Sequence, residues 1–193
     1  MDLLLNPDKF LKKDFSWRES LVVILLGTVV SLIVAFIVAQ SIAEEIKKTL
    51  PIPEAEIIAA FTYISIIVGA PISIVFSWVV FYTAIPYIVA RILSGTGKFS
   101  STMKKTAFAF VPNIILSPVS VILAYEKLEM VKYGIFVTPS EVMISVVAAL
   151  WSFIYLTFAV KHVMQLTIKK AIASAAIPLI ITVVGQLLSI YIK

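Results

Sequence analysis

The chain has 193 residues, of which 61% are hydrophobic and 14% are charged, and its mean hydropathy is +1.06. An average soluble domain carries roughly 25% charged residues, so this chain cannot cover itself with polar surface and has room for one membrane-embedded bundle. The absence of cysteine and the single histidine exclude disulfides, thiolate metal sites and a cysteine nucleophile.

The first nineteen residues predict a short helix at the cytoplasmic membrane surface. Asn6, Pro7 and Asp8 match a helix start, with a capping side chain, a proline at the first position and an acid in the first turn. Basic residues alternate here with apolar ones, which is typical of a helix in the membrane interface. We expect the following side chains to lie among the lipid headgroups: Phe10, Leu11, Phe15 and Trp17.

The first membrane span is predicted over residues 20–43, and together with four further spans it forms a membrane domain over 20–193. Small residues recur in it at every fourth position, which predicts a face that packs closely on a neighbouring helix or on a second copy of the chain. The members of this face are Gly27, Ser31, Ala35, Ala39 and Ala43.

The stretch from 54 to 93 is too long for one simple crossing, because as one helix it would extend well beyond a hydrocarbon core of about 30 Å. Gly69-Ala70-Pro71 offers a break, since proline removes a backbone donor. We predict a second span over 72–92, preceded by a lead-in helix over 54–68, with one long kinked helix as the alternative.

The third span, over 105–125, is predicted to be kinked because Pro112 and Pro118 lie within it, beside Asn113 and Ser117. Asn113 has two interpretations. Its amide either satisfies carbonyl groups that the prolines leave free or marks a transport site on a broken helix.

The fourth and fifth spans are predicted over 140–160 and 171–192. His162 follows the fourth span, where it would cap the helix or contact headgroups. Gln186 in the fifth span would bond to a neighbouring helix.

The distribution of basic residues predicts the orientation. Eleven Lys and Arg residues fall on the side of the N-terminal segment and five on the other side, which places the N-terminus in the cytoplasm and the C-terminus outside. The inner loops contain no acidic residue, so we expect a basic cytoplasmic surface that attracts anionic lipid headgroups. Its members are Arg91, Lys98, Lys104, Lys105, Lys161, His162, Lys169 and Lys170.

No catalytic site can be assembled from this sequence, because no proposed span carries an ionisable residue near its centre. Gly95-Thr96-Gly97-Lys98 lacks the glycine spacing and the preceding strand of a phosphate-binding loop. We therefore predict a protein that is not an enzyme and holds no metal or cofactor, and the missing charges also disfavour an ion-coupled transporter.

Three short motifs are informative: Gly95, Gly97 and Phe99 followed by Val111-Pro112-Asn113; the opening Asn6-Pro7-Asp8-Lys9-Phe10; and Trp151 with Lys161-His162-Val163 and Lys170-Ala171. Together they resemble the Yip family of Ypt/Rab-interacting membrane proteins, and the third is similar to prokaryotic members. The resemblance implies five spans with a cytoplasmic N-terminus, located in the cell membrane if the source is prokaryotic. Eukaryotic members are linked to vesicle trafficking through a long N-terminal region, whereas here about nineteen residues precede the first span.

Two classes of function remain open from the sequence. The first is a Yip-type scaffold or adaptor that binds lipids or membrane-protein partners, but not nucleic acid, through its basic loops and small-residue faces. The second is a transporter or channel for a small solute or lipid, with its pathway near Asn113. A weaker third option is a subunit whose partner carries the chemistry.

Overall fold

A computed structural model describes residues 3, 6–49, 54–131 and 138–191, and every regular element in them is helical. Five helical stretches are long and apolar enough to cross a membrane. The predicted all-α, five-span bundle is therefore confirmed, and the protein is an integral multi-pass membrane protein.

The chain begins with α2 (Pro7–Leu11), followed by the long α3 (Trp17–Thr49). The Asn6 side chain accepts a hydrogen bond from the Lys9 amide at 3.0 Å, as its position before Pro7 predicts. Ser16 and Glu19 form a reciprocal cap at the start of α3, in which the Glu19 carboxylate accepts from the Ser16 amide at 2.7 Å. With 33 residues, α3 is about 50 Å long, which exceeds a 30 Å hydrocarbon core.

The second span is one continuous helix, made of α4 (Glu54–Phe76), η1 (Ser77–Ala84) and α5 (Ile85–Ile92). The predicted break at Gly69-Ala70-Pro71 is wrong, and the alternative of one long helix is the structure observed. Within a bilayer, a continued helix is the way to satisfy the remaining backbone groups, so one proline does not end it.

The irregularity in this span lies instead at η1, a π-helical turn directly before Pro86. There the Ile85 amide donates to the Val80 carbonyl, five residues back. A proline ring clashes with the carbonyl four residues earlier, and a widened turn makes room for it.

The third span consists of α6 (Phe99–Thr106), η2 (Ala107–Phe110) and α7 (Val111–Val131). Pro112 has no N–H for the Phe108 carbonyl, which accepts from the Val111 amide instead and tightens η2 into a 3₁₀ turn. The predicted irregularity therefore precedes Pro112, while α7 continues through Pro118.

The last two spans are α8 (Pro139–Met164) and α9 (Ile168–Tyr191). A capping box of Thr138 and Glu141 begins α8, and Gln165, with φ of 54°, ends it in the left-handed conformation.

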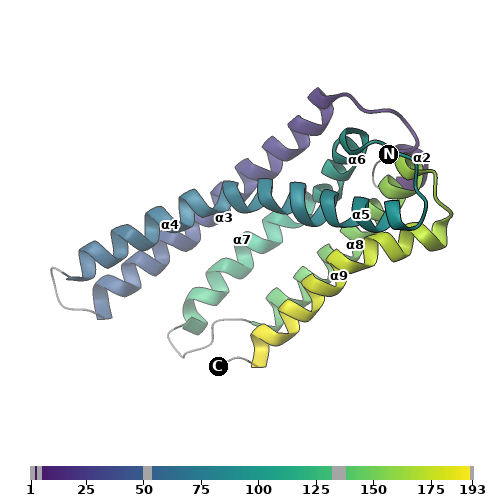
Figure 1. Cartoon of the computed structure of the whole chain (residues 1–193). Helices are drawn as coiled ribbons and strands as arrows, with labels where there is room; N and C mark the ends of the chain where they lie inside the picture. The colour runs from purple at the N-terminus through teal and green to yellow at the C-terminus, as the bar shows by residue number, and fades with distance from the viewer. Residues whose placement is uncertain (1–2, 4–5, 50–53, 132–137, 192–193) are drawn as a thin grey trace.

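The helices converge at one end of the molecule, where α2, α5 and α6 pack on α8 (Figure 1). We call this the basic end; it also contains the loop 93–98. Away from it, the hairpin of α3 and α4 diverges from α7, α8 and α9 (Figure 1). In the most apolar 18-residue stretch of Glu54–Ile92 only 6% of the residues are buried, whereas 44% are buried in the corresponding stretch of Phe99–Leu123. The span that contains α4 therefore presents most of its surface to lipid or to a partner.

Candidate functional site

At the basic end, the N-terminal helix α2 is bound to α8 by hydrogen bonds and ion pairs. The Asp8 carboxylate accepts hydrogen bonds from Lys161 Nζ at 2.8 Å and from His162 Nε2 at 2.7 Å. The hydrogen bond from Lys161, assisted by that from His162, holds the pKa of Asp8 below its usual value. His162 therefore contacts the N-terminal helix through the Asp8 carboxylate and, at 3.1 Å, through the Asp8 carbonyl oxygen, while its predicted contact with headgroups stays a prediction.

The apolar face of this segment packs into protein rather than among headgroups. Leu11 is fully buried, and Phe10 and Phe15 surround the Phe108 ring at centroid distances of 5.2 and 4.3 Å. Only Trp17 of the predicted interfacial residues is largely exposed. The prediction that these side chains lie among headgroups is therefore wrong for Leu11 and Phe15, which are buried in the protein core.

Lys105 does not belong to the basic surface. Its side chain is buried, and its ammonium group donates to the Leu11 carbonyl at 2.9 Å and lies 3.9 Å from Asp14. The sequence prediction is wrong for this residue, because the docked α2 covers it.

The loop 93–98 is fixed against the end of α8 by close backbone contacts. The Thr96 amide donates to the Met164 carbonyl at 3.1 Å. A Cβ atom added to Gly97 would lie 2.3 Å from the Val163 carbonyl oxygen, and one on Gly95 would lie 2.9 Å from the Ala90 carbonyl. Both glycines are therefore required by close approach, whereas Phe99 is partly exposed and packs edge-on against Tyr87.

Two cations from different helices converge on this loop. The Arg91 guanidinium donates to the Gly95 carbonyl at 3.1 Å, and the Lys170 ammonium donates to the Leu93 carbonyl at 3.0 Å. Lys98, at the end of the loop, and Lys169, next to Lys170, are exposed, and Lys104 is half-buried. The structure thus brings together Arg91 of α5 and Lys170 of α9, which are far apart in the sequence.

The small-residue face of α3 lies where α3 meets α4 and α7. Ala35 and Ala39 are buried, and the position of a Cβ on Gly27 would lie 3.8 Å from Ile114 of α7. Ser31 and Ala43 are half-buried.

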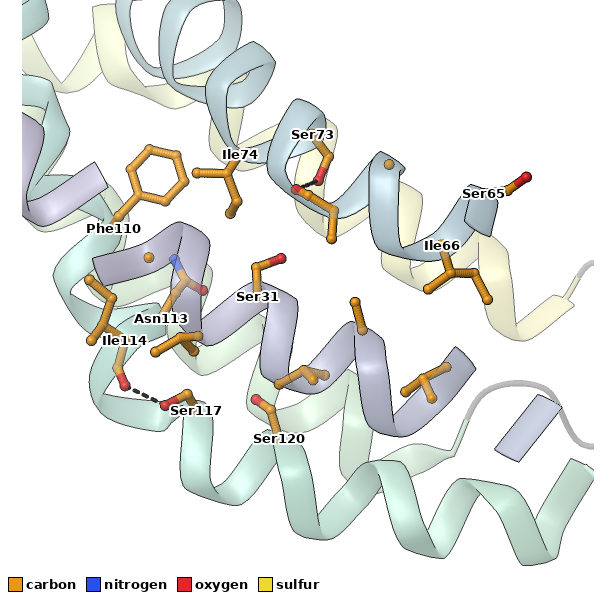
Figure 2. A pocket seen from close by; sticks show the side chains of 17 residues that line it. Ser31, Ser65, Ile66, Ser73, Ile74, Phe110, Asn113, Ile114, Ser117 and Ser120 are labelled. Atoms are coloured by element: carbon orange, nitrogen blue, oxygen red, sulfur yellow. Dashed lines mark hydrogen bonds between the residues drawn. The ribbon is translucent and has the colours of Figure 1, made fainter. Parts of the chain in front are cut away.

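A cleft of about 570 Å³ opens between α3, α4 and α7, beside this face (Figure 2). Valine and isoleucine side chains form much of its wall. The polar lining consists of Ser31, Ser65, Ser73, Asn113, Ser117 and Ser120.

Asn113 does not repair the backbone of the kinked span. Pro118 has no N–H to donate to the Ile114 carbonyl. That carbonyl accepts a hydrogen bond from the Ser117 hydroxyl at 2.7 Å instead. The Asn113 amide nitrogen donates to Ser152 of α8 at 3.3 Å, and its side chain is exposed in the cleft. The predicted repair role is therefore wrong for Asn113 and belongs to Ser117, while the side chain of Gln186 lies outside the described part of the structure.

Several polar contacts between helices carry no signal in the sequence. Trp78 donates to the Met103 carbonyl at 2.9 Å, and the hydroxyls of Thr83 and Thr106 lie 2.7 Å apart in a buried pair. Each residue is common in membrane helices, and only the packing brings them together. Within the described residues, no group of three or more His, Cys, Asp or Glu side chains is placed to hold a metal ion.

Comparison with known proteins identifies the family. The model of the Yip1 domain matches residues 1–190. An uncharacterized protein of Methanocaldococcus jannaschii is 29% identical over 129 residues, which cover 65% of this chain and 87% of that protein. No solved structure matches. With nearly its whole length matched, and with the five-span helical fold described above, the chain belongs to the Yip1 family.

Proposed function

We propose that the protein is a non-enzymatic membrane scaffold whose basic end binds anionic groups, either lipid headgroups or acidic segments of partner proteins. The observation that carries this proposal is the convergence of Arg91 and Lys170 on the loop 93–98. Both cations are on helices and are tied to carbonyl groups of this loop, which holds them in a fixed arrangement, so little ordering accompanies binding.

The charge of this surface supports the same function. The stretches 91–105 and 161–170 contain seven Lys and Arg residues and no Asp or Glu, and Lys105 and Lys161 are engaged with α2. The remaining cations face outward or contact backbone carbonyls. Near a membrane each such cation contributes about 1 kcal/mol to the attraction of anionic lipid. We place this end at the cytoplasmic face of the cell membrane.

Native mass spectrometry of the protein in lipid mixtures tests the proposal. Arg91→Gln combined with Lys170→Gln should lower retention of phosphatidylglycerol relative to phosphatidylcholine by at least about tenfold, given the contribution of two cations. Lys47→Gln with Lys48→Gln, at the opposite end of α3, is the matched control and should leave retention unchanged.

Partner proteins are tested in the native membrane by a photoreactive amino acid at position 98, with position 47 as the control. A specific cross-linked protein or lipid at position 98 supports the scaffold. Equal lipid retention in both double variants, together with no cross-link at position 98, would contradict it.

A second candidate function, transport of a lipid or small solute, is favoured by the cleft that reaches Asn113. Its test is flux in liposomes that contain the wild type or Asn113→Leu. Flux above empty liposomes that the substitution abolishes would place the function in the cleft, whereas no flux leaves the scaffold as the proposal.

A further inference from the structure

The cleft between α3, α4 and α7 combines apolar walls with uncharged polar side chains. We propose that it binds one uncharged membrane lipid through a hydroxyl group, which donates a hydrogen bond to the Asn113 side-chain oxygen and accepts one from the Ser31 hydroxyl. This inference goes beyond the scaffold role and does not depend on the basic end.

The first argument concerns two polar groups on the cleft wall. Among the residues that the structure describes, neither the Asn113 carbonyl oxygen nor the Ser31 hydroxyl has a hydrogen-bond partner. The hydroxyls of Ser73 and Ser117 differ, because they donate to the Ala70 and Ile114 carbonyls of their own helices. Figure 2 shows Ser31 directed into the space that faces α4, with Asn113 close to the Phe110 end of the cleft.

The second argument is the depth of these groups. Asn113 follows Lys105 by eight residues, which corresponds to about 12 Å of helix. In a hydrocarbon core of about 30 Å this position is near the middle, where an unsatisfied polar group is costly. A ligand that donates to Asn113 and accepts from Ser31, as a hydroxyl does, removes that cost.

The third argument is the chemistry and size of the cleft. Its seventeen lining residues include no charged side chain, so the embedded part of the ligand is uncharged. A volume of about 570 Å³ is within the range of sites for single small molecules. Diacylglycerol and long-chain alcohols combine a hydroxyl group, no charge and an apolar chain.

A photoreactive dioleoylglycerol analogue in liposomes with the full-length protein tests this proposal. We expect labelling of the cleft segments 27–38, 65–74 and 110–120, and competition by excess dioleoylglycerol. Gly69→Leu should reduce this labelling at least about fivefold, since the added side chain enters the cleft. A Cβ on Gly69 meets no atom within 4 Å, and leucine favours the helix more than glycine does, so the variant retains its fold.

Gly185→Leu is the matched control, because Gly185 is also helical with open space around its Cβ position but does not line the cleft. Its labelling should equal that of the wild type. Equal labelling of Gly69→Leu and Gly185→Leu would overturn the proposal.

The hydrogen bond is tested separately by Asn113→Leu, which should weaken competition by dioleoylglycerol about fivefold. Thr182→Val is its control, since the Thr182 hydroxyl bonds to the Pro178 carbonyl within α9. A photoreactive hydrocarbon that lacks any hydroxyl and labels the cleft as well as the diacylglycerol would contradict recognition by Asn113. Cross-links between two copies of the chain through the cleft would assign the site to protein and also overturn the proposal.

Discussion

At the residue scale, Asp8 joins the N-terminal helix to α8, and we predict that this contact is needed to keep the helix docked. Its carboxylate is partly exposed and pairs with Lys161 and His162. Because its pKa is lowered from 3.8 on folding, the stabilisation is complete above that value and is lost as the pH falls through the lower folded pKa. A spin label at Lys13→Cys, in a chain without other cysteines, should be immobile at neutral pH and become mobile only below about pH 4.

In Asp8→Asn the same label should already be mobile at pH 7, since the ion pairs are gone. Asp14→Asn is the control, because the Asp14 side chain is fully exposed and lies 3.9 Å from Lys105. Such an exposed carboxylate contributes little to stability. An immobile label in Asp8→Asn at pH 7 would show that Leu11 and the aromatic contacts hold α2 without the carboxylate.

The glycines of the loop 93–98 give a second residue-scale prediction. Gly97→Ala places a methyl group 2.3 Å from the Val163 carbonyl oxygen, so the loop must shift, and we expect a destabilisation of about 1–3 kcal/mol in reversible unfolding with detergent. Gly69→Ala meets no atom within 4 Å and should be neutral or stabilising by up to about 1 kcal/mol. Equal stability of the two variants would refute the close-approach argument.

At the element scale, the close contact of α3 with its neighbours depends on small side chains. Ala39 is fully buried on that face, so Ala39→Leu should overpack it and lower stability by about 1–3 kcal/mol. Ala173→Leu, at an exposed position of α9, is the control and should have little effect. Detergent-induced unfolding monitored by circular dichroism measures both, and an unchanged midpoint for Ala39→Leu would show that the face does not pack tightly.

The helices also show which structural features can be predicted from the sequence and which cannot. The apolar runs predict the five spans and the Asn6-Pro7 cap predicts the start of α2, because both are local features. The behaviour of each proline is not local. Pro71 lies in a continuous helix, Pro86 follows a π turn and Pro112 follows a 3₁₀ turn, and which solution forms depends on neighbouring carbonyls and on packing.

In the candidate site, too, local features can be predicted from the sequence and contacts between distant residues cannot. The basic residues are visible in the sequence, yet the burial of Lys105 and the meeting of Arg91 with Lys170 follow from the docking of α2 and α9. Asn113 is identifiable as a polar residue in an apolar span. Its side chain is not needed to repair the backbone, because the Ser117 hydroxyl bonds to the carbonyl that Pro118 leaves without a donor. Such contacts join distant parts of the chain and carry no periodic signal.

At the scale of the whole molecule, the number of membrane spans and the distribution of basic residues together predict which end is cytoplasmic. Five crossings place α2 and the end of α9 at opposite ends of the bundle, as Figure 1 shows. Eleven of the sixteen basic residues lie on the side of α2, which predicts that this side is cytoplasmic. The absence of cysteine allows each position to be tested by a single introduced thiol.

In intact cells, a membrane-impermeant maleimide should label Ser140→Cys at the start of α8 but not Ser100→Cys or Thr167→Cys at the basic end. All three should react after the cells are opened, which controls for access, because Ser100 and Thr167 are exposed and Ser140 is half-buried. Labelling of Ser100→Cys and Thr167→Cys before opening would reverse the orientation. The basic end would then face away from the anionic inner leaflet, and the electrostatic basis of the scaffold proposal would be lost.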